Sequence, residues 1–247
     1  RMIAEDVLQE GFIKVFTGLK SYTASGSGNV GKTGSMARFS IYKDYLYAVT
    51  NTQMHILDLK GETPERVSQP IRAGWDVETI FSYKDCMYLG TRTGMIIYSV
   101  ADPLKPDYAS RINHIYGCDP VVVEDDLAYV TVWSGNACGQ NINELFIVDV
   151  SDIYNPHQIV SYSMKSPKGL GIDNGTLFVC DDGLKVFDAA DPQKIMSNQL
   201  AHYKGMDGYD VILHNQILMM IADDGLYQYN YADLKNIHLL SKLSFEK

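Results

Sequence analysis

Residues 26–33 match the spacing of a nucleotide-binding loop. They read Gly26-Ser27-Gly28-Asn29-Val30-Gly31-Lys32-Thr33, which fits the pattern G-x-x-x-x-G-K-T. In such a loop, backbone amides and the lysine hold phosphates and the threonine binds Mg²⁺, with a strand before the loop and a helix after it. Here residues 36–42 follow, and their alternating apolar side chains predict a strand. We therefore interpret residues 26–33 as a flexible linker and expect no nucleotide or other cofactor.

Three acidic pairs could supply oxygen ligands to a metal ion: Asp125-Asp126, Asp181-Asp182 and Asp223-Asp224. A calcium loop needs several oxygen ligands at a defined spacing and a closing glutamate, which these pairs lack. Gly183 and Gly225 follow two of the pairs, and Asp-Gly is typical of hairpin turns between strands. We therefore expect turns and no metal site, and we interpret the sequon at residues 174–176 as a turn as well.

The segments that carry these residues repeat with a period of about forty residues. An apolar strand followed by a polar turn returns five times, with turn-initiating residues at Asp58, Ser99, Asp149, Asp188 and Asn230. In the first unit the strand candidates are residues 38–42, 45–50, 54–59 and 66–71. Four short antiparallel strands per unit predict an all-β, five-bladed β-propeller in which each blade covers its neighbour.

The propeller is expected to occupy residues 36–247, in units of about 36–74, 75–115, 116–165, 166–206 and 207–247. Residues 1–35 form an N-terminal extension that ends in the Gly/Ser-rich linker. Within it, Phe12-Ile13-Lys14-Val15-Phe16 resembles one more strand, which could protect the outer edge of the last blade. An incomplete sixth blade is the alternative interpretation.

The repeat resembles that of the LVIVD-repeat family. The resemblance covers residues 36–245 and lies in the strand Leu145-Phe146-Ile147-Val148-Asp149 and the turn Asp102-Pro103-Leu104-Lys105-Pro106. It implies a bacterial, β-propeller-like protein that is exported, periplasmic or anchored at the cell surface and has no assigned activity. Ser99 and Asn230 depart from the repeated aspartate, which weakens single turns more than the fold. Because the sequence begins Arg1-Met2, an export signal or lipid anchor could precede it.

The net charge of the chain limits the classes of partner that it is expected to bind. The formal net charge is -9 and the lysines and arginines are scattered, which disfavours nucleic acids and anionic membranes. No apolar run approaches the roughly 20 residues of a membrane-spanning helix. We expect a monomer whose partner is a protein or a glycan.

Two of the four cysteines are expected at the same end of the third blade. Cys118 directly precedes the first strand of that unit, and Cys138 lies in an insertion between its second and third strands. In an exported protein we expect a disulfide between them, and in a reducing compartment two free thiols. Cys86 and Cys180 fall in second strands of other units and are expected to be small buried residues.

A binding surface is predicted where the first strands begin. Aligning the units places Ala37, Glu78, Asp119, Lys168 and Asp210 at one level near the mouth of the central channel. Arg38, Trp75, Asp76, His114, Tyr116, Trp133, His202 and Tyr209 fall around them. Aromatic rings mixed with carboxylates can stack on and hydrogen-bond a sugar or a peptide. The predicted ligand-binding residues are Trp75, Asp76, Glu78, Tyr116, Asp119, Trp133, Tyr209 and Asp210.

The sequence favours a non-enzymatic binding or scaffolding propeller that presents this face to a protein or a glycan. The alternative is a hydrolase or lyase that acts on a glycan through two of Glu78, Asp119 and Asp210, because glycoside cleavage uses two carboxyl groups across one bond. A purely structural interpretation also stays open, in which the charged groups pair with one another and the tryptophans pack between blades.

Overall fold

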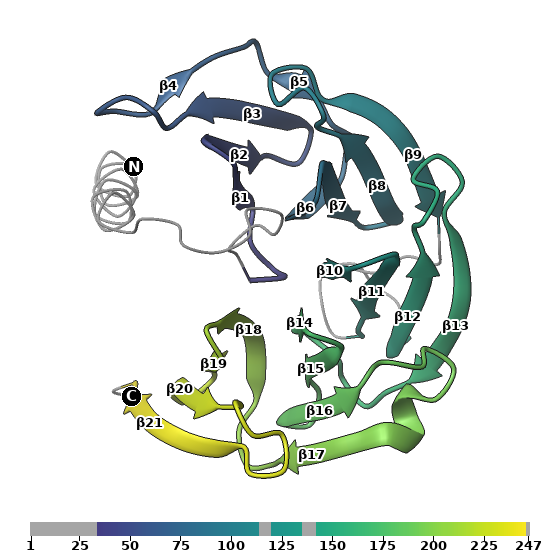
Figure 1. Ribbon diagram of the computed structural model, residues 1–247, viewed down its shortest axis with the longest axis vertical. Coiled ribbons are helices and arrows are strands. Elements are labelled where there is room, and N and C mark those ends of the chain that lie inside the picture. Colours follow the sequence, from purple (N-terminus) through teal and green to yellow (C-terminus); the bar gives the residue numbers. More distant parts are fainter. Residues whose placement is uncertain (1–33, 114–119, 135–141, 246–247) are drawn as a thin grey trace.

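Five four-stranded antiparallel sheets form a five-bladed β-propeller in the computed structural model, which describes residues 34–113, 120–134 and 142–245 (Figure 1). Blade 1 consists of β1 (Phe39–Tyr42), β2 (Tyr45–Val49) and β3 (Gln53–Asp58), and its outer strand is divided into β4 (Glu65–Arg66) and β5 (Ile71–Arg72). The predicted fold class is therefore confirmed. The single outer strand predicted at residues 66–71 is wrong, because residues 67–70 separate two short strands that end at Arg66 and begin at Ile71.

The other blades are continuous meanders. Blade 2 consists of β6 (Val77–Tyr83), β7 (Cys86–Thr91), β8 (Gly94–Ser99) and β9 (Asp107–Asn113). Blade 3 consists of β10 (Val121–Glu124), β11 (Leu127–Val132), β12 (Glu144–Asp149) and β13 (His157–Ser163). Blade 4 consists of β14 (Leu170–Asp173), β15 (Thr176–Cys180), β16 (Leu184–Asp188) and β17 (Gln199–Tyr203), with a 3₁₀ turn, Ile195–Asn198, before β17. Blade 5 consists of β18 (Gly208–His214), β19 (Ile217–Ala222), β20 (Gly225–Asn230) and β21 (His238–Ser244).

The turn after the third strand is built in the same way in every blade. A side-chain oxygen at the end of that strand accepts a hydrogen bond of 2.8–3.5 Å from the backbone amide two residues later. The acceptors are the five predicted turn residues, Asp58, Ser99, Asp149, Asp188 and Asn230. The aspartate that recurs at this position thus begins an Asx-type turn, and asparagine and serine can accept the same hydrogen bond.

The hairpins between second and third strands differ from one another. Asp182 and Gly183 both have positive φ, at 54° and 107°, as the predicted Asp-Gly turn requires. The same expectation for residues 224–225 is wrong, because Gly225 is the first residue of β20 and Asp223-Asp224 make the connection. A Cβ atom on Gly225 would lie 2.4 Å from the Leu243 carbonyl oxygen, so the glycine permits the close approach of β21. The sequon residues Asn174 and Gly175 form the β14–β15 turn, as predicted.

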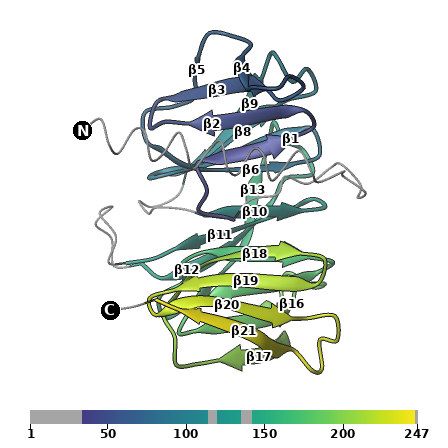
Figure 2. The ribbon, with the colours of Figure 1, turned by 90° about the vertical axis from the view of Figure 1, so that its left-hand side faces the viewer.

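The hydrophobic core lies between neighbouring blades, and the first strand of each blade is innermost (Figure 1). One cluster joins blades 1 and 2, a second joins blades 2 to 4, and a third joins blades 4 and 5. In the described part of the chain no such cluster joins blade 5 to blade 1. Figure 2 faces this junction, and the ribbons of β10 and β11 on the far side are visible between blades 1 and 5. We call the junction the seam.

Strand burial shows the same asymmetry. β15 of blade 4 is buried at every position, and five of six positions are buried in β7 and β11. In β20 of blade 5, by contrast, buried and partly exposed positions alternate, and β19 follows nearly the same pattern. A sheet covered on both faces has the first pattern and a sheet covered on one face has the second. The expectation that every blade covers its neighbour therefore fails at the seam.

Candidate functional site

The loop face is the end of the propeller where the first strands begin and the turns between second and third strands lie. In blade 2, for example, Val77 at the start of β6 pairs with Thr91 at the end of β7. The described members of the predicted site fall into three groups on this face, built around Asp76, Lys168 and Asp210, and the last two groups adjoin, because the Gly169 amide bonds the Tyr209 carbonyl. The predicted residues His114, Tyr116 and Asp119, the disulfide pair Cys118 and Cys138, and the loop at residues 26–33 lie outside the described residues.

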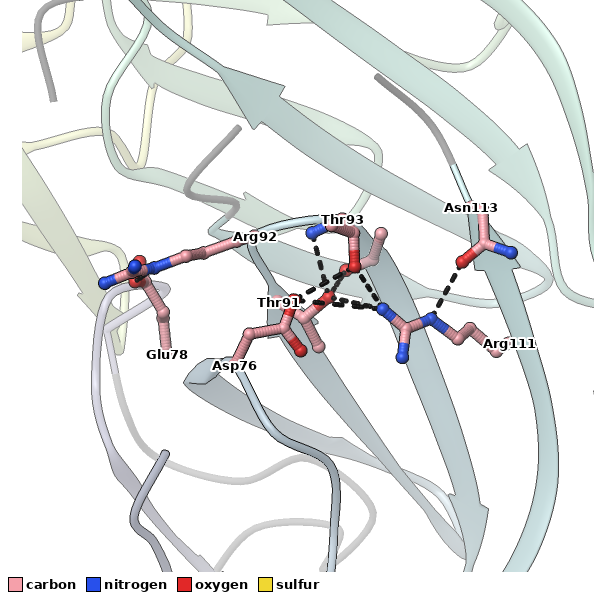
Figure 3. Close-up of polar contacts among 8 residues, drawn as sticks. Asp76, Glu78, Thr91, Arg92, Thr93, Arg111 and Asn113 are labelled. Atoms are coloured by element: carbon pink, nitrogen blue, oxygen red, sulfur yellow. Dashed lines mark hydrogen bonds and ion pairs between the residues drawn. The ribbon is translucent and has the colours of Figure 1, made fainter. Parts of the chain in front are cut away.

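The first group is a polar network on blade 2 (Figure 3). Asp76 is buried, and its Oδ2 accepts a hydrogen bond of 2.9 Å from the Thr93 hydroxyl. The Arg111 guanidinium lies 3.9 Å from the same oxygen, donates to Thr93 and donates a 2.8 Å bond to Asn113. Asp76 therefore holds the β7–β8 turn to the end of β9. The sequence analysis did not identify Thr93 and Arg111, because nothing in the repeat pattern distinguishes them from ordinary turn and strand residues.

Trp75 and Glu78 flank this network. Glu78 accepts a 2.8 Å hydrogen bond from Arg92 and forms an ion pair with it at the surface. Trp75 is 60% exposed, which makes it the most exposed of the large aromatic residues in the described part of the chain. The residue after Trp75 is Asp76, whose side chain and carbonyl bond Thr93 and the Arg92 amide, so the exposed tryptophan directly precedes an anchored position of the backbone.

The second group surrounds Lys168, which lies before β14 and is buried. Its Nζ lies 2.6 Å from a carboxylate oxygen of Asp207. The same atom is 4.2 Å from the centre of the Tyr209 ring and 5.5 Å from that of the Trp133 ring. A lysine of the protein therefore occupies the space between two of the predicted ligand-binding aromatics, and a cation–π contact stabilises it there.

The third group anchors the segment that leads into blade 1. Asp210, on β18, accepts hydrogen bonds from the Ser35 hydroxyl at 2.8 Å and from the Met36 amide at 3.1 Å. The Ser35 hydroxyl oxygen accepts a 2.9 Å bond from the amide of Leu170 on β14. Burial raises the pKa of Asp210 to about 6, although its hydrogen bonds oppose the rise. Asp210 thus ties the start of blade 1 to the inner strands of blades 4 and 5.

A cleft of about 450 Å³ opens on the loop face between blades 4 and 5. Its lining includes the carboxylates of Asp182, Asp207, Asp223 and Asp224. Three of them form ion pairs with lysines, and Asp223 accepts a hydrogen bond from the Asp207 amide. No group of histidine, cysteine and acidic side chains in the described ranges is arranged to hold a metal ion. The acidic pairs therefore act here as partners of lysines and of turn amides.

The remaining predicted residues also have structural partners. Arg38 donates to Asn51 at 2.6 Å and to the Val77 carbonyl at 3.0 Å. His202 makes a 2.9 Å hydrogen bond with the Asp182 carbonyl. Cys180 is a buried free thiol, as predicted, whereas the free thiol Cys86 is only partly buried.

Comparison with known proteins finds structural similarity but no sequence relative. No family model matches, and no curated protein matches. A protein of unknown function from Desulfotomaculum acetoxidans has a TM-score of 0.63 and 10% identity over 91% of this chain and 72% of its own. A protein from Lactobacillus plantarum has a TM-score of 0.59 and 14% identity over 82% of this chain and 68% of its own.

A third similar structure is Hsv2 of Kluyveromyces lactis, with a TM-score of 0.54 and 11% identity over 83% of this chain and 68% of its own. At such low identities these similarities support the fold alone. Among the described residues, none forms a helix long and apolar enough to cross a membrane. The chain therefore has the fold of a five-bladed β-propeller, and its assignment to the LVIVD-repeat family stays a prediction.

Proposed function

We propose that this protein is a non-enzymatic binding or scaffolding propeller that holds a partner protein on its loop face. The observation that carries the proposal is the position of Trp75. Its side chain is 60% exposed, and the next residue, Asp76, belongs to the polar network with Thr93 and Arg111, in which the buried Asp76 Oδ1 atom has no hydrogen-bond partner among the described residues. An exposed tryptophan on a rigid support, surrounded by charged groups, is the usual composition of an interface hot spot and its rim.

A protein partner fits this surface better than a glycan. A sugar site combines an aromatic ring with polar groups that are free to bond the sugar hydroxyls. Near Trp75, the Glu78 carboxylate is paired with Arg92, and the Asp76 carboxylate is buried beside Thr93. Between blades 3 and 5, Lys168 occupies the space that a sugar would need between Trp133 and Tyr209.

Acid–base catalysis on a glycan is less well supported. A glycosidase needs two carboxyl groups that can reach one bond. Glu78 forms an ion pair, and Asp210 is covered by Ser35 and Met36, whose backbone it anchors. Glu78 and Asp210 thus each have a structural role. The third candidate, Asp119, lies outside the described residues.

The protein is further proposed to be an exported or lipid-anchored bacterial protein of the LVIVD-repeat type. The repeated Asx turns after the third strands support this proposal. Thiol titration of the denatured, unreduced protein tests it. A Cys118–Cys138 disulfide leaves two reactive thiols out of four cysteines, whereas four reactive thiols in protein isolated from its native compartment would contradict it.

The binding function is tested with a phage-displayed peptide library and a glycan array, both probed with the full chain. Saturable binding to selected peptides is expected, and Trp75→Ala should weaken it at least about tenfold, which is about 1.4 kcal/mol. Tyr154→Ala is the matched control, because Tyr154 is 57% exposed and lies in a turn at the opposite end of blade 3. Binding that is insensitive to Trp75, or saturable binding to glycans only, would contradict the proposal.

A further inference from the structure

Blade 5 has an apolar face that residues 34–36 cover only at its inner edge, near Asp210 and Ile212. Ile221, Leu226 and Leu243 pair across three strands and form one row on this face. Ile212 and Met219 form the adjacent row. Ile212 is 41% exposed, Ile221 44% and Leu243 66%. In β18, β19 and β20 these residues alternate with buried ones, and Leu243 of β21 pairs with Leu226, so all of them lie on the face turned toward the seam.

The other face of blade 5 shows what a covered face looks like. Val211, Met220 and Tyr227 form a row there, and all three are buried. They belong to the cluster that includes Phe178 and Val186 of blade 4. The seam face of blade 5 is also apolar along the row of Ile221, Leu226 and Leu243 and at Ile212 and Met219, whereas the row of Met219 ends in the polar pair Gln228 and Ser241.

Blade 1 presents a second apolar face to the seam. Ile41, Leu46 and Leu57 pair across β1, β2 and β3, on the side opposite Tyr47 and Ile56. Tyr47 and Ile56 pack against blade 2 and are fully buried, whereas Ile41 and Leu57 are partly exposed and Leu46 between them is 4% exposed. Two rows of apolar side chains thus border the seam, and the one on blade 5 is the more exposed of the two.

The N-terminal segment enters the described part of the chain beside this seam. A Cβ atom on Gly34 would lie 2.2 Å from Asp210 and 3.5 Å from the side chain of Ile212, a residue of the uncovered face. From there, residues 35–37 cross to blade 2, where the Ala37 carbonyl accepts a hydrogen bond from Ile80. The residues that precede Gly34 therefore start from the inner edge of the uncovered face of blade 5.

The sequence of the N-terminal segment contains a strand suited to this place. In an extended chain, Phe12, Lys14 and Phe16 point to one side, and Ile13 and Val15 point to the other. Such a strand is apolar on both sides apart from one lysine, as a strand between two apolar sheets must be. Residues 17–33 can span on the order of 50 Å when extended. A four-stranded blade is only about 15 Å wide, so the connection is long enough to reach any part of the seam.

We propose that residues 12–16 form an additional strand in the seam, where they cover the apolar face of blade 5 and join it to blade 1. These residues lie outside the described part of the chain, and the proposal rests on the two apolar faces and on the position of Gly34. It is independent of the function proposed for the loop face. A second copy of the chain is the competing occupant of the seam.

Hydrogen–deuterium exchange of the full chain, followed by mass spectrometry, tests the proposal. The amides of residues 12–16 should exchange about 100-fold more slowly than their intrinsic rates, as in a stable strand. Ile221→Lys places a charge in the seam and should return these amides to intrinsic rates while β14–β16 stay protected. Leu104→Lys, at a 40% exposed leucine in a blade 2 turn, is the control and should change neither region.

A second variant keeps the test valid if Ile221→Lys fails to fold. Ile13→Asp alters only the N-terminal segment, and it should accelerate exchange in β19–β21 and leave β10–β13 unchanged. Intrinsic exchange rates at residues 12–16 in the wild-type monomer would overturn the proposal. So would a concentration-dependent dimer, measured by light scattering, in which β19–β21 become protected while residues 12–16 do not.

Discussion

Asp210 should lose its proton as the pH rises from about 4 to about 7, and this loss should lower the free energy of unfolding of the protein. Asp210 has a pKa of about 6 in the folded protein, against an ordinary value of 3.8. Between these two values the folded state binds more protons than the unfolded state, so the free energy of unfolding decreases with increasing pH. The contribution of Asp210 is complete below about pH 4 and is lost as the pH rises through about 6.

The magnitude follows from the interval between the two pKa values. At 1.36 kcal/mol per pH unit, and because both titrations are incomplete at the ends of the range, it corresponds to about 2 kcal/mol between pH 4 and pH 7. The cause is burial of the carboxylate beside Ser35 and Leu170, which the hydrogen bonds from Ser35, Met36 and Val211 offset only in part.

Urea unfolding of the wild type and of Asp210→Asn at several pH values between 4 and 7 measures this contribution. The variant cannot titrate at this position, so subtracting its free energy of unfolding from that of the wild type removes the other groups. The difference should fall by about 2 kcal/mol between pH 4 and pH 7. A difference that is flat, or that rises with pH, would show that the carboxylate of Asp210 is not destabilised by its burial.

Two further substitutions test the turns that hold the blades. Glu124 accepts hydrogen bonds from the amides of Asn174 at 2.8 Å and Gly175 at 2.6 Å. Glu124→Ala should therefore lower the free energy of unfolding in urea by about 2 kcal/mol. A change near zero would contradict this link between blades 3 and 4. The Ser99 hydroxyl accepts its hydrogen bond from the turn amide at 3.5 Å, whereas the Asp and Asn side chains of the other four turns do so at 2.8–3.0 Å. Ser99→Asp should therefore stabilise the protein by about 0.5 kcal/mol in urea unfolding. Destabilisation would refute the equivalence of the five turns.

The repeat in the sequence predicted the fold because it arises from interactions between residues that are close in the sequence. The alternating strands and the turn residues Asp58, Asp149 and Asp188 act within a few positions of one another. Even the departures, Ser99 and Asn230, form the same turn. The first blade's outer strand was mispredicted because the prediction passed over Pro70, which has no amide hydrogen for a strand ladder and lies between the residues that pair with β3.

The candidate site was predicted in position but not in its contacts. The sequence placed Trp75, Lys168 and Asp210 at one end of the propeller, which the strand order determines. It did not predict that Lys168 would lie against Tyr209 and Asp207, because those contacts cross from one blade to the next. The sequence also did not predict the seam, because the strands of blade 5 have apolar residues much like those of the blades that are covered on both faces.

Fluorescence of Trp75 offers the most direct test of the proposed binding function. Trp75 and Trp133 are the only tryptophans in the chain, so Trp75 is the sole emitter in Trp133→Phe, which keeps an aromatic ring beside Lys168. Titration with a library-selected peptide should shift the emission to shorter wavelength and at least halve quenching by acrylamide, because the partner covers a ring that is 60% exposed. Saturable binding that leaves both the emission and the quenching of Trp75 unchanged would contradict the account.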